Sequence, residues 1–258
     1  MLVIVYLVLF FILGSAVGSF LNVVVDRTTR GEGILGRSYC EYCRATLKTL
    51  DLVPIISFVT LGARCRYCRK PLSWQYPLVE LTAAVLFTLA FWILISGGTF
   101  GFVTLAFWLV VVSVMIVVAV VDLKFSLIPT SFVYALSLIS LFYVYFTSPS
   151  PVFINHVLAA FGAAAFFLLI VLVTLGRGMG QGDIVLAFLM GIILGVEQTI
   201  FSLFAAFFVG AVISIFLVLF GKKKFGNTIP FGPFLVFGFF VALFWGEKLL
   251  SYYFKMLY

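Results

Sequence analysis

The stretch that decides the fold is Phe100–Val121, which reads FGFVTLAFWLVVVSVMIVVAVV and contains no charged residue. A helix that crosses the hydrocarbon core of a bilayer needs about 20 apolar residues, and this stretch supplies them. Lipid offers no partner for backbone N–H and C=O groups, so such a segment must pair them internally as a helix. The stretch therefore predicts a membrane-spanning helix, and Asp122 follows directly at its end.

Similar apolar segments fill most of the remaining chain. Ile184–Gly195 is the shortest of them, with 12 residues. The pairs Gly14-x3-Gly18 and Gly191-x3-Gly195 indicate close helix packing. Together the segments predict an all-α polytopic membrane protein with about eight transmembrane helices. The expected spans are Leu2–Val25, Leu78–Ser96, Phe100–Val121, Ile128–Phe146, Val152–Leu175, Ile184–Gly195, Thr199–Phe220 and Ile229–Leu249.

The composition supports this interpretation. Of the 258 residues, 64% are hydrophobic and 10% are charged, whereas an average soluble domain has about 45–50% apolar and about 25% charged residues. A soluble domain of this size could not cover its surface with so few charges. An ordinary soluble protein, a disordered chain and a secreted disulfide scaffold are therefore excluded. Residues 26–77 remain as the main water-facing region.

The basic residues predict the orientation of the chain, because Lys and Arg mark cytoplasmic loops. Nine of the 16 basic residues lie in residues 26–77. If the chain crosses the membrane eight times, with successive loops on alternate faces, 14 basic residues lie on the same face as this loop and two lie on the opposite face. The other residues on the loop side are Lys124, Arg177 and 222–224, and those opposite are Lys248 and Lys255. The basic cytoplasmic face predicts contact with anionic lipid, and nucleic-acid binding is not expected.

All four cysteines lie in this loop, as Cys40-x2-Cys43 and Cys65-x2-Cys68, separated by 21 residues. Two such pairs are typical of a four-cysteine zinc site, in which a tight turn lets both thiolates of a pair face one metal. The alternatives are two disulfides or four free thiols, and a cytoplasmic location argues against disulfides. Structural zinc is the preferred interpretation, because so small a loop cannot build a robust core unaided.

Two of the few acidic residues stand at the expected cytoplasmic ends of spans. Asp122 ends the third, and Asp183 opens the sixth after the glycine-rich run 176–182. Helices that cross in opposite senses can bring such ends together. Two close carboxylates share one proton, so one can act as a base toward water while the other donates to a scissile carbonyl. This is the chemistry of aspartic peptide hydrolysis, and it needs no metal.

Other interpretations of the polar residues stay open. The aspartates could cap helices, extend their side chains toward the interface, or pair with Lys124 or Arg177. Glu80 is expected to be a helix-start acid, with a substrate or cofactor contact as the alternative. His156, the only histidine, is expected at the outer interface.

At the level of motifs, the chain resembles the type IV prepilin peptidases, membrane aspartic peptidases of the GxGD group. The similarity extends over nearly the whole chain, and six motifs in this order are highly specific. They are Gly18-Ser19-Phe20-Leu21-Asn22-Val23-Val24 with Arg27, the two cysteine pairs, Tyr76-Pro77-Leu78-Val79-Glu80-Leu81, Asp122-Leu123 with Ile128-Pro129, Gly180-Gln181-Gly182-Asp183, and Ile229-Pro230-Phe231-Gly232-Pro233-Phe234.

The resemblance implies a bacterial inner-membrane enzyme that cleaves the basic leader of prepilins or pseudopilins at the cytoplasmic face. Asp122 and Asp183 match the catalytic aspartates of the family. The cysteine insert implies a second activity, N-methylation of the new amino terminus with S-adenosylmethionine. The expected spans and the resemblance together divide the chain into three parts. These are a first transmembrane helix at 1–25, a cytoplasmic zinc-binding insert at 26–77 and a seven-helix peptidase core at 78–258.

The chain departs from the family pattern at Thr130, Val185 and Asp26, none of which removes a catalytic group. A proton-coupled transporter with intramembrane aspartates is the alternative function, although a transporter would not need the four cysteines. A catalytically idle assembly factor is a third possibility, and the retained aspartate pair argues against it.

Overall fold

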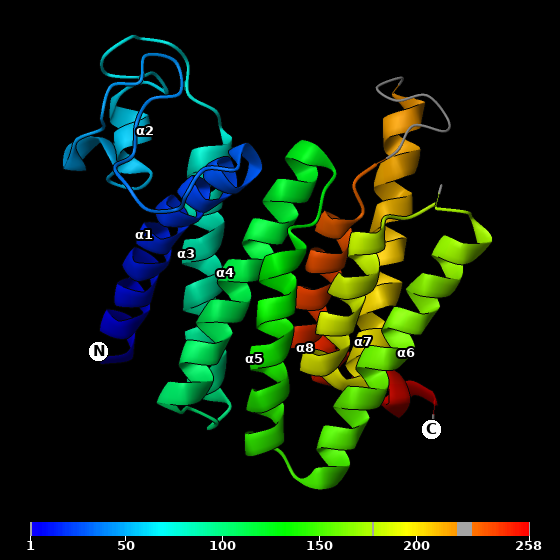
Figure 1. Ribbon diagram of the computed structural model, residues 1–258. Coiled ribbons are helices and arrows are strands. Elements are labelled where there is room, and N and C mark those ends of the chain that lie inside the picture. Colours follow the sequence, from blue (N-terminus) through cyan, green and yellow to red (C-terminus); the bar gives the residue numbers. More distant parts are fainter. Residues whose placement is uncertain (1, 177, 221–228, 258) are drawn as a thin grey trace. The chain divides into compact units, whose positions relative to one another are not determined.

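The computed structural model describes residues 2–176, 178–220 and 229–257. Over these residues the chain is helical, with no strand beyond two isolated β-bridges. Arg177 and residues 222–224, which entered the charge count, lie outside them. The elements are α1 (Leu2–Arg30), η1 (Thr49–Asp51), α2 (Ile56–Thr60), α3 (Gln75–Ser96), α4 (Phe102–Phe125), α5 (Thr130–Thr147), α6 (Ser150–Val173), α7 (Gln181–Leu219) and α8 (Gly232–Leu257) (Figure 1).

Seven of these helices, α1 and α3 to α8, are long and apolar enough to cross a bilayer. The prediction of an all-α multi-pass membrane protein is therefore confirmed. Two helices reach farther than their apolar segments. α1 continues to Arg30, and α4 continues to Phe125, so Asp122 lies within the last turn of its helix. The hydropathy of the sequence marks only the lipid-embedded part of a helix, while backbone hydrogen bonding carries the helix into the polar interface.

The chain forms two compact units, Met1–Val117 and Val118–Tyr258. In the first unit, α1 packs against α3 through its two small residues. A Cβ on Gly14 would lie 2.7 Å from the Ala83 carbonyl oxygen, and one on Gly18 would lie 2.7 Å from the Glu80 Cα. The close packing predicted from Gly14-x3-Gly18 is thus confirmed, because only glycine lets the two backbones approach this far.

In the second unit, α7 contains a break. Its 39 residues are too many for one crossing, and Gly195 has φ 74° and ψ 175°, which no helix contains. At the break, the Val196 N–H donates to Asn155 Oδ1 at 2.9 Å, and His156 Nδ1 lies 2.7 Å from the Ile192 carbonyl oxygen. The start of α6 therefore supplies partners for backbone groups that the break removes from helical pairing.

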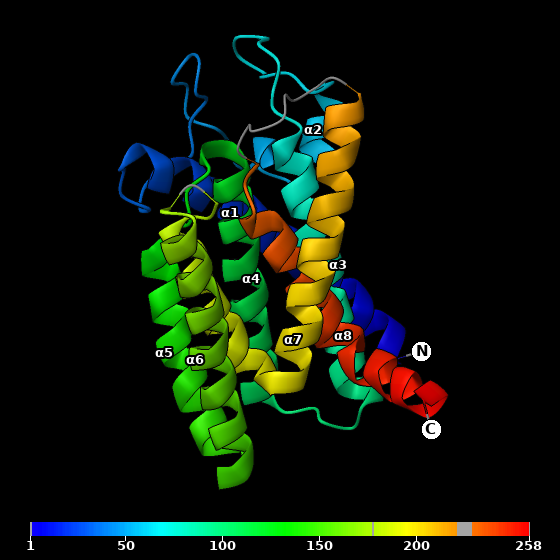
Figure 2. The same cartoon turned by 90° about the vertical axis from the view of Figure 1, so that its right-hand side faces the viewer.

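The chain reverses at Gly195. Asp183, near the start of α7, lies close enough to Asp122 for their charges to interact. Gly210, beyond the break, packs against Phe231, next to the Gly232 N–H that binds Asp122. The start of the first arm and the middle of the second thus lie near Asp122, and Figures 1 and 2 show the arms running in opposite directions.

Counted as two arms, α7 brings the number of crossings to eight, as the sequence predicts. The first arm has about 14 residues, or about 21 Å, less than the roughly 30 Å of hydrocarbon. Gly191 packs directly against Ala159 and Ala160 of α6, as its spacing motif predicts. Gly195 does not serve this packing and forms the reversal instead, because its backbone conformation is essentially restricted to glycine.

Replacing Gly195 with alanine is expected to destabilise the protein by about 1–3 kcal/mol, because the side chain strains this backbone conformation. The nearest atom to a Cβ there is His156 Nε2 at 3.5 Å, so backbone strain is the cause rather than a clash. Thermal unfolding in detergent measures the effect. Gly162→Ala is the control, since a Cβ there meets nothing within 4 Å and Gly162 lies within α6. Equal stability of the two variants would contradict the explanation.

Candidate functional site

The four cysteines form two turns with the same backbone hydrogen bonds. In each turn, the first cysteine makes two backbone hydrogen bonds. Its N–H donates to the carbonyl oxygen of the residue five positions later in the chain, and its carbonyl oxygen accepts the N–H of the residue four positions later. The bonds are Cys40 to Ala45, Arg44 to Cys40, Cys65 to Lys70 and Arg69 to Cys65, all between 2.9 and 3.0 Å. Arg44 and Arg69 close the two turns with positive φ angles of 57° and 60°. The two halves of the insert are therefore copies of one local structure.

The four sulfur atoms all lie within 4.8 Å of one another. Cys40 Sγ and Cys68 Sγ are 3.8 Å apart, and all four cysteines are free, so the disulfide alternative is wrong. Thiolates at about 2.3 Å from a tetrahedral metal ion lie about 3.8 Å from each other. The cluster therefore has the size that a four-thiolate metal centre requires.

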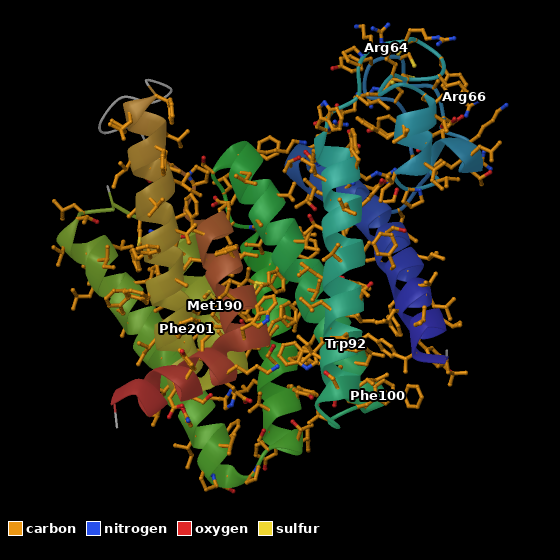
Figure 3. The ribbon with its side chains drawn as sticks, turned by 180° about the vertical axis from the view of Figure 1, so that it is seen from behind. Arg64, Arg66, Trp92, Phe100, Met190 and Phe201 are labelled. Atoms are coloured by element: carbon orange, nitrogen blue, oxygen red, sulfur yellow. The ribbon has the colours of Figure 1, made fainter. Side chains whose placement is uncertain are left out.

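The environment of Cys40 favours a ligating thiolate. Burial alone would raise the pKa of Cys40, but backbone N–H groups of Cys43 and Tyr42 point at its sulfur and lower the pKa to about 7. Cys68 shifts the other way: the backbone N–H of Lys70 lowers its pKa, but burial and the three neighbouring thiols raise it to about 11. Basic residues surround the cluster, with Arg66 paired to Asp51 at 2.5 Å. Figure 3 shows Arg64 and Arg66 at the end of the insert away from Trp92 and Phe100. This basic surface offsets the negative charge that four thiolates and one divalent metal would leave.

Asp122 is held by the first backbone N–H of another helix. It is 5% exposed, and its Oδ2 accepts the Gly232 N–H at 2.8 Å. Gly232 begins α8, where the helix has N–H groups without intrahelical partners and a positive dipole end. A Cβ on Gly232 would lie 2.6 Å from that same oxygen. Glycine is therefore required for the carboxylate to reach the end of α8.

Asp183 lies in the first turn of α7 and is 6% exposed. Its Oδ2 accepts the Gly180 N–H at 3.1 Å, so the capping interpretation is correct for this residue. Asp122 lies near enough for its charge to act on Asp183 as well. Asp183 can cap its helix and lie near Asp122 at the same time, because the cap uses only one of its two carboxylate oxygens.

Gly182 joins the segments that carry the two acids. A Cβ on Gly182 would lie 2.7 Å from the Ile128 Cβ, in the loop that follows α4. The contact places the turn before Asp183 against the loop after Asp122. The motifs around Gly182 and Gly232 were visible in the sequence, but their roles as contact points were not, because both depend on segments distant along the chain.

The arrangement indicates a class of protein. Two buried carboxylates, each bonded to a backbone N–H at the start of a helix, lie near enough for their charges to interact inside one multi-pass membrane unit. Two nearby carboxylates are the groups that an aspartic hydrolase uses for general acid and base catalysis on water. The arrangement is therefore compatible with a membrane aspartic hydrolase.

Comparison with known proteins identifies the family. Residues 12–94 match the bacterial peptidase A24 N-terminal domain, and residues 109–215 match the type IV leader peptidase family. The chain is 33% identical over 254 residues to the prepilin leader peptidase/N-methyltransferase of Bacillus subtilis, covering 95% of this chain and 97% of the relative. The chain belongs to the type IV leader peptidase family.

Two further relatives with the same name are similar over almost their full lengths. The enzyme of Legionella pneumophila is 30% identical over 92% of this chain and 91% of its own. The enzyme of Aeromonas hydrophila is 30% identical over 96% of this chain and 93% of its own. No solved structure matches the chain.

The two glycines of the GxGD motif are expected to differ in their tolerance of alanine. Gly182→Ala should lower the free energy of unfolding by about 1–3 kcal/mol, because its Cβ overlaps Ile128. Gly180→Ala is the matched control, since its Cβ would lie 3.6 Å from Asp183 Oδ2, an ordinary contact. Thermal unfolding of both variants in detergent distinguishes them, and equal loss would show that the Ile128 contact is unimportant.

Proposed function

We propose that this protein is a prepilin leader peptidase that also methylates the new amino terminus of its product. The observation that carries the proposal is the buried pair Asp122 and Asp183, in a chain whose relatives have this activity. The transporter alternative is not supported, because the relatives are enzymes. The substrates are prepilins or pseudopilins.

In the cleavage step, one of the two carboxylates is ionised and takes a proton from a water molecule. The resulting hydroxide attacks the carbonyl carbon of the peptide bond, and the other carboxyl group donates its proton to the carbonyl oxygen. Collapse of the tetrahedral intermediate releases the leader and a new amine, which takes a proton from the pair. The bonds from Gly232 and Gly180 hold the carboxylates in place throughout.

We place this chemistry at the cytoplasmic face of the bacterial inner membrane. The insert carries nine basic residues, and the two crossings of α3 and α4 return the chain to the side of the insert at Asp122. A prepilin leader lies in the cytoplasm, next to the apolar segment of its own chain. The basic surface would contact anionic lipid headgroups, and we assign no nucleic-acid partner.

For the insert, we propose a structural zinc ion bound by Cys40, Cys43, Cys65 and Cys68. Four thiolates complete a tetrahedral shell, so this metal stabilises the insert and takes no part in cleavage. The insert has few buried residues of its own, which makes its folding dependent on the metal. For the second activity, S-adenosylmethionine supplies the methyl group.

Replacing either aspartate with asparagine is expected to reduce cleavage by about 10²–10⁴-fold or more, because the pair loses its shared proton chemistry. Purified Asp122→Asn and Asp183→Asn are tested for processing of a prepilin in detergent. Glu197→Gln is the control, because Glu197 is an exposed acid beyond the break in α7. Full cleavage by either aspartate variant would reject the catalytic pair.

The metal proposal predicts about one zinc ion per chain by elemental analysis of the purified protein. Cys40→Ser should lose the metal and destabilise the insert, because a closed shell needs all four thiolates. Ser38→Ala, two residues away and outside the cysteine cluster, should keep it. Wild-type protein without zinc, or Cys40→Ser with a full equivalent, would contradict the proposal.

A further inference from the structure

The insert exposes apolar side chains around its short helix, α2. Ile56 is 62% exposed, Val59 is 70% exposed, and Trp74, which stands directly before α3, is 69% exposed. Ile56 and Val59 are three residues apart and share one side of α2, while Phe58 is buried. We call Ile56, Val59 and Trp74 the α2 patch. An exposed apolar patch on a part of the chain that is expected to face water marks contact with a protein or a membrane.

α3 provides a scale for the depth of this patch. Its 22 residues span about 33 Å, close to the roughly 30 Å of hydrocarbon that a transmembrane helix crosses. The first turns of α3 therefore lie at the boundary between the hydrocarbon and the headgroups. Trp74 immediately precedes these turns. Tryptophan is enriched at this depth in membrane proteins, because its ring is apolar and its N–H is polar.

Trp74 continues the exposed side of α3. All exposed large apolar side chains between residues 74 and 96 recur at helical spacing on one face, and they are Trp74, Leu78, Leu81, Val85 and Trp92. α1 packs on the opposite face, where Gly14 and Gly18 approach Ala83 and Glu80. Trp74 has helical backbone angles, φ −63° and ψ −15°, so it extends the exposed face by one position. Trp74 therefore lies on the side of α3 that faces lipid.

Two contacts hold α2 beside the start of α3. The rings of Phe58 and Trp74 lie 5.1 Å apart between centroids. The Ile55 N–H, directly before α2, donates to Glu80 Oε2 at 2.7 Å. Glu80 is the sixth residue of α3, so this bond draws the start of α2 to the level of the first two turns of α3. α2 thus lies at the depth of the membrane boundary.

A strained turn fixes the direction in which α2 leaves this contact. Ile55 has φ 62° and ψ −51°, and the Ile56 N–H donates to the Pro54 carbonyl oxygen at 2.5 Å. These features define a classic γ-turn, which is rare and strained, and a β-branched residue makes it more costly. Such strain persists only where the surrounding structure enforces it. The bond from Ile55 to Glu80 supplies that enforcement, so the position of α2 is a built feature of the unit.

We propose that the α2 patch inserts into the interface of the bilayer that α3 crosses, and so holds the insert against the membrane surface. The partner is lipid, at the level where headgroups meet acyl chains. The patch is continuous with the lipid-facing side of α3, and the apolar face of an interfacial helix reaches about 5–10 Å into this layer. This contact is apolar, so it is distinct from the attraction between the basic residues of the insert and anionic headgroups.

The test follows single tryptophans in the full-length protein, reconstituted without prepilin in vesicles of phosphatidylcholine and phosphatidylglycerol. Replacing Trp92, Trp108 and Trp245 with phenylalanine leaves Trp74 as the only tryptophan of the chain. A second variant in this background carries Trp74→Phe and Val59→Trp. Both should lose most of their fluorescence to lipids brominated near the top of the acyl chain, and less to lipids brominated near its end, because the patch lies shallow in the bilayer.

Arg64→Trp, combined with the four phenylalanine substitutions, is the matched control. Arg64 is an exposed residue of the same insert, and Figure 3 shows it at the end away from Trp92. Its tryptophan should be quenched by acrylamide in the water and should be unaffected by brominated lipid. Thermal unfolding in detergent verifies that each variant is folded.

Three results would overturn the proposal. Quenching of the Val59→Trp variant by acrylamide as strong as in the Arg64→Trp control would place α2 in water. Resistance to both quenchers would show that protein covers the patch, either another part of the chain or a second copy. Protection that appears only after a prepilin is added would make the patch a substrate surface instead.

Discussion

The structure depends on one constraint, that every backbone N–H and C=O within the bilayer must have a partner. Long helices meet it along most of the chain. The constraint becomes demanding where a helix starts or breaks inside the protein, and side chains meet it there. Asn155 and His156 serve the break at Gly195, and Asp183 serves the start of its own helix.

The candidate catalytic acids are part of this same solution. Asp122 binds the first N–H of α8, and Asp183 binds the N–H of Gly180 before α7. Each acid is therefore buried with a backbone partner that holds one oxygen and leaves the other for chemistry.

The insert solves a different problem, since it faces water and is too small to bury a core. Two copies of one cysteine turn converge on a metal-sized cluster, and Arg27 holds the loop between α1 and the first turn through backbone carbonyls. Together they form a wall against α1 and α3, and Cys40 and Cys65 of the cluster line a cavity behind it.

The sequence by itself determined the helical membrane class, the cysteine cluster and the two acids, because apolar length, cysteine spacing and a rare charge are local properties. Even the count of eight crossings was readable, although the sixth segment was short. The tertiary structure alone decided the reversal at Gly195, the contact of Gly182 with Ile128 and the bond from Gly232 to Asp122. Each of these depends on backbones from distant segments that approach within a few ångströms, and hydropathy, which averages over a single segment, carries no information about such approaches.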